Sequence, residues 1–144
     1  MGRIKPTKPP SGKIPSPAPL QNPHLTISFK HFNHREPFVF PSHEAKPNYP
    51  LTLFERLRDL CGMSPNELRN SRSKSLRSHP IAWEKTSKPE GFDHLNPQIR
   101  EQVIGWQFTI TKSEYGRIHG FWIEDVYYLV WVDHGHALYP KKDY

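Results

Sequence analysis

The feature that most constrains the fold is a strongly apolar stretch near the end of the chain, residues 105–140. Apolar and polar residues alternate over residues 106–111, as in a strand with one buried face. Residues 117–123 and 126–132 are apolar on both faces, and only two residues separate these runs. This pattern predicts three antiparallel strands, the last two joined by a tight hairpin at the centre of a sheet.

The two-residue loop sets the expected register of this hairpin. His119 is predicted to face Val130, and Trp131 is predicted to lie on the opposite face of the sheet from Arg117 and His119. A charged arginine and a histidine on a central strand require an explanation, because desolvating a charge is costly unless it is paired. These two residues are therefore the first candidates for a site.

The start of the chain differs in composition from the rest. Eleven of the sixteen prolines lie in the first fifty residues, and residues 1–23 are basic and poor in apolar side chains. Such a segment cannot bury enough apolar surface to offset its ordering entropy, so a disordered tail is predicted over residues 1–23. Residues 24–140 are expected to form a single domain, and residues 141–144 a short C-terminal tail.

The chain has neither the apolar core of a secretory signal nor a stretch long enough to span a membrane. Its one cysteine, Cys61, excludes an internal disulfide and suits a reducing compartment. We therefore expect a cytoplasmic protein that makes no membrane contact.

Two helix signals follow each other in the first half of the chain. Sequences typical of a capping box begin at Thr52 and at Ser64. Gly62 lies between them and provides the stop for the first helix. A helical hairpin is therefore expected over residues 51–70.

A third helix is predicted at residues 97–104, with Asn96 as its N-cap and Gly105 as its stop. Short strands are predicted at residues 25–29, 38–40 and 81–83. This order of elements predicts an α+β fold, in which an antiparallel sheet of about four to five strands packs on the helical hairpin.

Positive charge is concentrated in one connecting segment, residues 69–88. The formal net charge of the chain is +6, and this segment holds six Lys or Arg residues against one acid, together with several serines. Cations beside small hydroxyls suit phosphate oxygens, which predicts contact with a nucleic acid. The candidate RNA contacts are Arg69, Arg72, Lys74 and Arg77 in this segment, and Lys112 and His134 outside it. A solvated, mobile connection is the alternative interpretation.

Histidines gather after the last predicted strand. His134 and His136 flank Gly135 and follow Asp133, and an H-x-H pair can bind a metal when further ligands are close. A metal-dependent nuclease centred on these residues is one hypothesis, although no cysteine lies nearby, and a loop with incidental histidines is another. The preferred interpretation has no metal and no cofactor.

Metal-free cleavage of RNA needs a base for the 2′-hydroxyl proton, a cation for the developing phosphorane charge and an acid for the leaving oxygen. Arg117 and His119 share one face of a predicted strand, and the fold could bring His136 and Tyr139 close to them. These four residues form the candidate catalytic group. The alternative for His119 is a core histidine bonded to a neighbour.

The layout of residues 25–139 resembles the RelE/ParE-like superfamily of small bacterial toxins, many of which are mRNA-cleaving endoribonucleases. A first strand precedes a helical hairpin, and a run of antiparallel strands follows. The best local matches are the segment YGRIHGF at residues 115–121, the apolar strand at residues 126–131 and the ending HALY at residues 136–139.

The resemblance implies that Arg117 contacts phosphate, that His136 acts as an acid or base, and that Tyr139 stacks or transfers a proton. It also implies RNA, such as ribosome-associated mRNA, as substrate and a cognate antitoxin as partner. The first hypothesis is therefore an RNA-binding, metal-independent endoribonuclease toxin of a toxin–antitoxin pair. The second is a non-enzymatic accessory factor that binds nucleic acid or protein. The first hypothesis requires that the histidines lie close to Arg117 in the fold, whereas scattered histidines favour the second.

Overall fold

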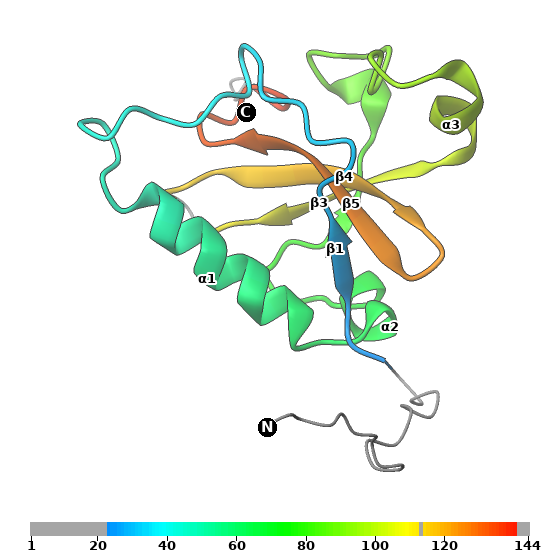
Figure 1. The fold of residues 1–144 in the computed structure, drawn as a ribbon, viewed down its shortest axis with the longest axis horizontal. Coiled ribbons are helices and arrows are strands. Elements are labelled where there is room, and N and C mark those ends of the chain that lie inside the picture. Colours follow the sequence, from blue (N-terminus) through cyan, green and yellow to red (C-terminus); the bar gives the residue numbers. More distant parts are fainter. Residues whose placement is uncertain (1–22, 113, 141–144) are drawn as a thin grey trace, which may run out of the picture.

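The computed structural model describes residues 23–112 and 114–140, which form an α+β fold with a five-stranded sheet (Figure 1). The predicted tails therefore lie outside the described residues, apart from Pro23. The elements are β1 (Thr26–Ser28), α1 (Tyr49–Cys61), α2 (Pro65–Arg69), β2 (His79–Pro80), a 3₁₀ turn (Trp83–Lys85), α3 (Pro97–Gln102), β3 (Ile104–Thr109), β4 (Arg117–Ile123) and β5 (Val126–Asp133). No helix among the described residues is long and apolar enough to cross a membrane.

The strands lie in the order β1-β5-β4-β3-β2. Neighbouring strands are antiparallel except for β1 and β5, which run parallel with Thr26 opposite Val126. The prediction of an antiparallel sheet is thus confirmed for most of the sheet, and β1 is the exception. The β3–β4–β5 meander forms its centre, as the apolar stretch predicted.

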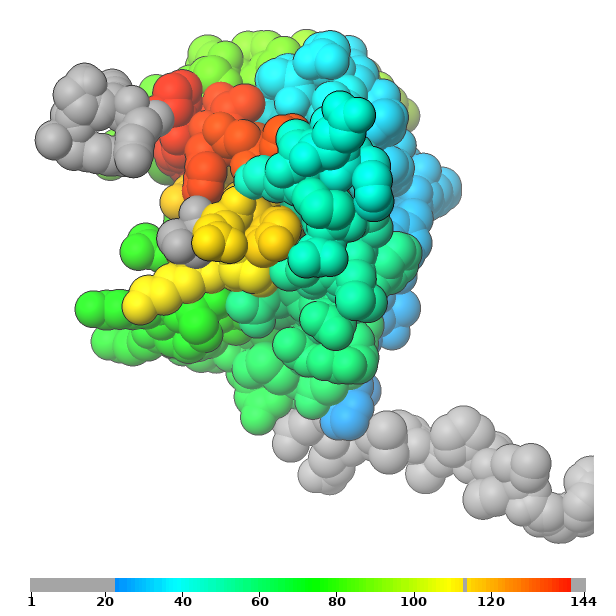
Figure 2. Space-filling view, turned by 90° about the vertical axis from the view of Figure 1, so that its left-hand side faces the viewer, coloured from blue at the N-terminus to red at the C-terminus, as the bar shows by residue number. Residues whose placement is uncertain are grey.

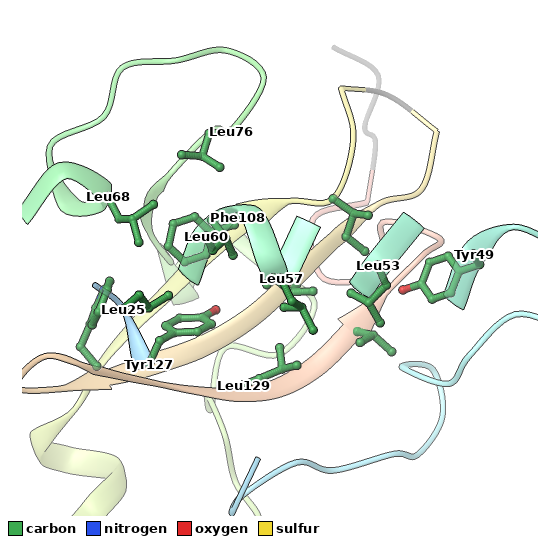
Figure 3. Packing of buried hydrophobic residues seen from close by; sticks show 14 residues of the cluster. Leu25, Tyr49, Leu53, Leu57, Leu60, Leu68, Leu76, Phe108, Tyr127 and Leu129 are labelled. Atoms are coloured by element: carbon green, nitrogen blue, oxygen red, sulfur yellow. The ribbon is translucent and has the colours of Figure 1, made fainter. Parts of the chain in front are cut away.

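The helical hairpin covers one face of the sheet. Leu53, Leu57 and Leu60 recur at helical spacing along α1 and point at the strands, where they pack on residues such as Tyr127 and Leu129 (Figure 3). Each of these side chains is buried. The prediction that the sheet packs on a helical hairpin is therefore confirmed.

The other face is covered by connecting segments and by α3. Phe121 and Trp131 lie in a second cluster with Phe38 and Phe92, which come from loops before α1 and α3. The rings of Phe38 and Trp131 stack with their centroids 4.2 Å apart. Because both faces are covered, β4 and β5 are almost wholly buried, as their two-sided apolar sequence predicted.

A β-bulge in the central hairpin corrects the predicted register. Beyond Gly120 the pairing shifts, so His119 lies opposite Trp131 and not opposite Val130. The extra residue turns the Trp131 side chain to the face that carries His119, where the two rings are 6.5 Å apart. Gly120 permits the bulge, because a Cβ there would overlap the carbonyl oxygen of Tyr128 and lie 2.7 Å from the Tyr127 ring.

Two of the three predicted helix N-caps are confirmed, and one is wrong. Ser64 forms both hydrogen bonds of its capping box with Glu67, and Asn96 caps α3 as expected. The Thr52 cap was wrong: α1 begins at Tyr49 after Asn48, so Thr52 lies inside the helix. A proline at the first turn of α1 is itself a start signal and places the helix start earlier.

Two of the predicted short strands and the end of the third helix also differ from the prediction. Residues 38–40 form no strand and contribute only an isolated bridge between Arg35 and Phe38. The short strand expected at residues 81–83 lies two residues earlier, as β2, because the chain turns into a 3₁₀ helix at Trp83. Gly105 does not end α3 but lies within β3, beneath the Trp83 ring.

The bulge makes a testable prediction about two glycines. Gly120→Ala should lower the free energy of unfolding by about 3 kcal/mol or more, because the added methyl overlaps backbone that cannot move away. Gly135→Ala is the matched control, since a Cβ there meets nothing within 4 Å, and it should change stability by about 0.5 kcal/mol or less. Urea unfolding measures both values, and equal effects would contradict the packing around Gly120.

Candidate functional site

The basic connection between α2 and β2 folds around a surface hollow of about 290 Å³. This volume is at the lower end of the range for small-ligand sites. The lining residues are Ser71, Arg72, Ser73, Lys74, Arg77, Ser78 and His79. Three of the predicted RNA contacts therefore come together in one concave surface. None of the lining residues is acidic.

The middle of this connection is tied to the body of the protein. Leu76 is buried, and its carbonyl accepts a hydrogen bond of 2.8 Å from the Thr109 amide. The Arg56 guanidinium donates to the Ser75 carbonyl over 2.9 Å. Arg77 has a positive φ of 45°, a conformation that is uncommon for a residue with a side chain. The cations of the hollow thus project from a loop whose backbone is fixed at several points.

The remaining predicted RNA contacts lie outside the hollow. Arg69 forms an ion pair of 3.2 Å with Asp125 and lies over the Trp122 ring, 4.0 Å from its centroid. It therefore braces the turn between β4 and β5. Lys112 is exposed beyond the end of β3, and the His134 ring lies 6.0 Å from that of Tyr49.

Three side chains meet beside the hollow, at the end of the sheet where β4 begins. The His79 ring lies 6.5 Å from the Tyr139 ring, and the Arg117 guanidinium carbon lies 6.0 Å from the same ring. The Tyr139 hydroxyl accepts a hydrogen bond of 2.8 Å from the Ala82 amide. Two predicted catalytic residues, Arg117 and Tyr139, are thus brought together with His79.

His79 was not predicted to belong to the site. The available signal was its position directly after the basic run, where Arg77 and Ser78 precede it. Sequence alone did not show that β2 would present the imidazole at the rim of the hollow.

His119 is fully buried and bonded to Asp133. Its Nε2 lies 3.0 Å from the Asp133 carboxylate, which also accepts hydrogen bonds from the amides of Ala137 (2.7 Å) and Leu138 (2.9 Å). Neither His119 nor Asp133 has appreciable exposed surface. The geometry corresponds to the alternative interpretation of His119 as a core histidine bonded to a neighbour.

Burial and hydrogen bonding compete at this pair. Burial lowers the pKa of His119 below its ordinary value, although the bond to Asp133 favours the charged form. Burial alone would raise the pKa of Asp133, but the hydrogen bonds from His119 and from the backbone amides outweigh it and lower that pKa. The carboxylate is therefore charged at neutral pH and the imidazole is neutral, with Nε2–H as the donor.

Several buried polar atoms lie next to His119 on the same face of the sheet. Gln107 lies opposite His119 in the pairing of β3 and β4, and it also lies opposite His79 in the pairing of β2 and β3. Both amide atoms of Gln107, the Thr109 hydroxyl and His119 Nδ1 are buried without a hydrogen-bond partner among the described residues. Most buried polar groups in proteins are paired, so this row is unusual.

The remaining histidines, His134 and His136, lie in the turn after β5. Figure 2 shows this turn (red) next to residues 114–116 (yellow), and Gly116, which has a positive φ, approaches the Asp133 backbone closely. Burial, followed by the charge of Lys46, lowers the pKa of His134. The backbone of His136 has a φ of 58°. No group of three His, Cys, Asp or Glu residues suited to a metal occurs in the part of the chain that is described.

No protein-family model, curated protein or solved structure matches this chain. The resemblance to the RelE/ParE-like superfamily therefore stays a prediction. Function is inferred from the hollow and from the residues that adjoin it.

The buried Thr109 hydroxyl leads to a prediction about stability, and Thr111 provides a matched control. Thr109→Val should leave the free energy of unfolding unchanged or raise it by about 1 kcal/mol, because it removes a buried polar atom that has no partner within residues 23–112 and 114–140. Thr111→Val should lower it by about 1 kcal/mol, because the Thr111 hydroxyl accepts from the amides of Glu114 and Tyr115. Denaturant unfolding compares the two, and a large loss in Thr109→Val would show that its hydroxyl is bonded.

The lowered pKa of His119 predicts a dependence of stability on pH. The unfolded chain takes up a proton at His119 near its ordinary pKa of 6.5, whereas the folded chain does so only at lower pH. The free energy of unfolding should therefore fall as the pH drops from about 7.5 to about 5.5. His119→Gln should reduce this slope without abolishing it, since burial also lowers the pKa of His94 and His134. If urea unfolding gives the wild type and His119→Gln the same slope of unfolding free energy against pH, His119 does not stay neutral in the folded chain.

Proposed function

We propose that this protein binds RNA through the basic hollow. The observation that carries the proposal is the grouping of Arg72, Lys74 and Arg77 on one concave surface with no acid among the lining residues. These three side chains are exposed, so binding a phosphate does not require them to leave a buried partner. Three serines line the same hollow. The Ser78 hydroxyl already donates to the Leu68 carbonyl, so Ser71 and Ser73 supply the small hydroxyls that can donate to phosphate oxygens.

A single strand fits the size of this surface better than a duplex does. The cations come from one short connection and surround a small hollow, which suits one or two adjacent phosphates. Proteins that bind single strands commonly combine such a basic groove with aromatic rings on which bases stack. His79 supplies a ring that lines the hollow, and the Tyr139 ring lies 6.5 Å from it.

Metal-independent cleavage of the bound RNA is the second candidate function. One specific observation favours it, namely that a cation, a phenol and an imidazole (Arg117, Tyr139 and His79) meet beside the phosphate-binding surface. These are the kinds of group that transfer protons and stabilise charge when RNA is cut without a metal. Without cleavage, the same surface serves a non-enzymatic accessory factor.

The biological setting in this proposal is that of a toxin of the RelE/ParE-like kind. Its RNA would include ribosome-associated mRNA, and a cognate antitoxin would neutralise it by covering the basic hollow. The cytoplasm is the compartment in which such an RNA and such a partner are found.

The binding proposal is tested by removing the three cations together. Replacing Arg72, Lys74 and Arg77 with Gln should weaken binding of a single-stranded RNA irrespective of its sequence. The slope of log affinity against log salt should fall by about 2, since each phosphate contact on a single strand contributes about 0.7. Fluorescence anisotropy over a series of salt concentrations measures both quantities.

The control removes the same charge elsewhere. Lys30, Arg58 and Lys85 are exposed and none of them lines the hollow. Their replacement with Gln should leave most of the affinity and most of the salt slope in place. An equal loss in the two triple variants would show that binding depends on net charge alone and would contradict a site at the hollow.

A further inference from the structure

We infer that His79 is the general base of an RNA-cleaving site at the rim of the hollow, and that its substrate is single-stranded RNA with a free 2′-hydroxyl. The inference rests on the proposed binding of RNA at the hollow and goes beyond it by naming the group that takes the proton. His79 lies outside the catalytic group predicted from sequence.

The hydrogen bonding of His79 fixes its tautomer. Nδ1 lies 2.8 Å from the carbonyl oxygen of Pro80. A carbonyl can only accept, so in the neutral ring Nδ1 carries the hydrogen and Nε2 carries the lone pair. The bond also orients the ring, because Pro80 is the next residue of the same strand. Nε2 is therefore the atom of His79 that can accept a proton.

The position of His79 places this base next to bound phosphate. Its side chain is exposed and lines the hollow together with Lys74 and Arg77. A phosphate held by these cations leaves the adjoining ribose at the rim, within reach of the imidazole. Pairing of β2 with β3, where His79 lies opposite Gln107, holds the backbone of this residue in the sheet.

Tyr139 supplies the acid on the other side of the scissile bond. Its ring lies 6.5 Å from that of His79, close enough for both side chains to reach one phosphodiester. The Tyr139 oxygen accepts the Ala82 amide hydrogen, so its own proton is available to donate. The same amide and the nearby Arg117 guanidinium stabilise the phenolate that forms.

The reaction balances without a metal or an oxidant. The proton of the 2′-hydroxyl moves to His79 Nε2, and the 2′-oxygen forms a bond to the adjacent phosphorus. The bond between phosphorus and the 5′-oxygen breaks, and the Tyr139 hydroxyl protonates that oxygen. The products are a 2′,3′-cyclic phosphate and a 5′-hydroxyl end, and solvent returns the proton from His79 to Tyr139.

The experiment uses the full chain and a labelled single-stranded RNA of mixed sequence, with and without ribosomes, and follows cleavage and binding separately. Binding is measured on the same strand with 2′-deoxyribose, which cannot be cut by this route. His79→Asn keeps a donor for the Pro80 carbonyl but lacks Nε2, and His43→Asn is the control at an exposed histidine outside the hollow.

Wild-type protein should cut the RNA to cyclic-phosphate ends in the presence of a chelator. His79→Asn should lower the cleavage rate by about 10²–10⁴, with binding and thermal midpoint unchanged. His43→Asn should cut the RNA at the wild-type rate. Cleavage by His79→Asn at the wild-type rate, or of the 2′-deoxy strand, would overturn the inference.

The two proposals fail in different ways. Wild-type protein that binds RNA at the hollow but never cuts it, alone or with ribosomes, would overturn the role of His79 and leave the binding proposal intact. If a chelator stops the cleavage, a metal-bound hydroxide and not His79 activates the reaction, and the role of His79 is overturned. Failure to bind single-stranded RNA at all would overturn both.

Discussion

The buried carboxylate of Asp133 holds together the part of the structure on which the site depends. It accepts hydrogen bonds from His119 on β4 and from the amides of Ala137 and Leu138 beyond β5. A buried charge is tolerated only when it is well paired, so these bonds are required once the carboxylate is in the sheet. As a consequence the chain folds back after β5 and carries Tyr139 to the Ala82 amide.

This arrangement divides the polar residues into a buried and an exposed group. His119 and Asp133 lie within the sheet and fix the turn, whereas His79 and the cations of the hollow face solvent. Tyr139 links the two groups, because the turn after β5 positions its backbone and its ring lies 6.5 Å from the His79 ring. In the proposed function, phosphate contact and structural support therefore fall to different residues.

Features with a local cause could be predicted from sequence. The capping box at Ser64 and the Asn96 cap depend on neighbouring residues. The strands of the meander were identified by one alternating run and by two runs that are apolar on both faces. Features that depend on distant contacts could not. The bulge arises where Gly120 approaches the Tyr128 carbonyl. The parallel pairing of β1 with β5 joins strands that are about 100 residues apart in the sequence.

The candidate site was predictable to the same degree. The basic run and Arg117 could be named as candidates because charge and strand pattern are visible in the sequence, and Tyr139 could be named because it lies shortly after the last strand. The pairing of His119 with Asp133 and the position of His79 depend on packing between strands, so the sequence did not predict them. The contacts of Arg69 with Asp125 and the Trp122 ring also join segments that are distant in the sequence, so the sequence did not show that this cation lies outside the hollow.

The most direct test of the central claim is a map of the amides that respond to RNA in ¹H–¹⁵N NMR spectra of the ¹⁵N-labelled chain. On titration with a short single-stranded RNA, we expect the largest shift changes over residues 71–79 and at Tyr139, with little change along α1. Changes confined to α1 or to the turn between β4 and β5, with none over residues 71–79, would contradict a binding site at the hollow.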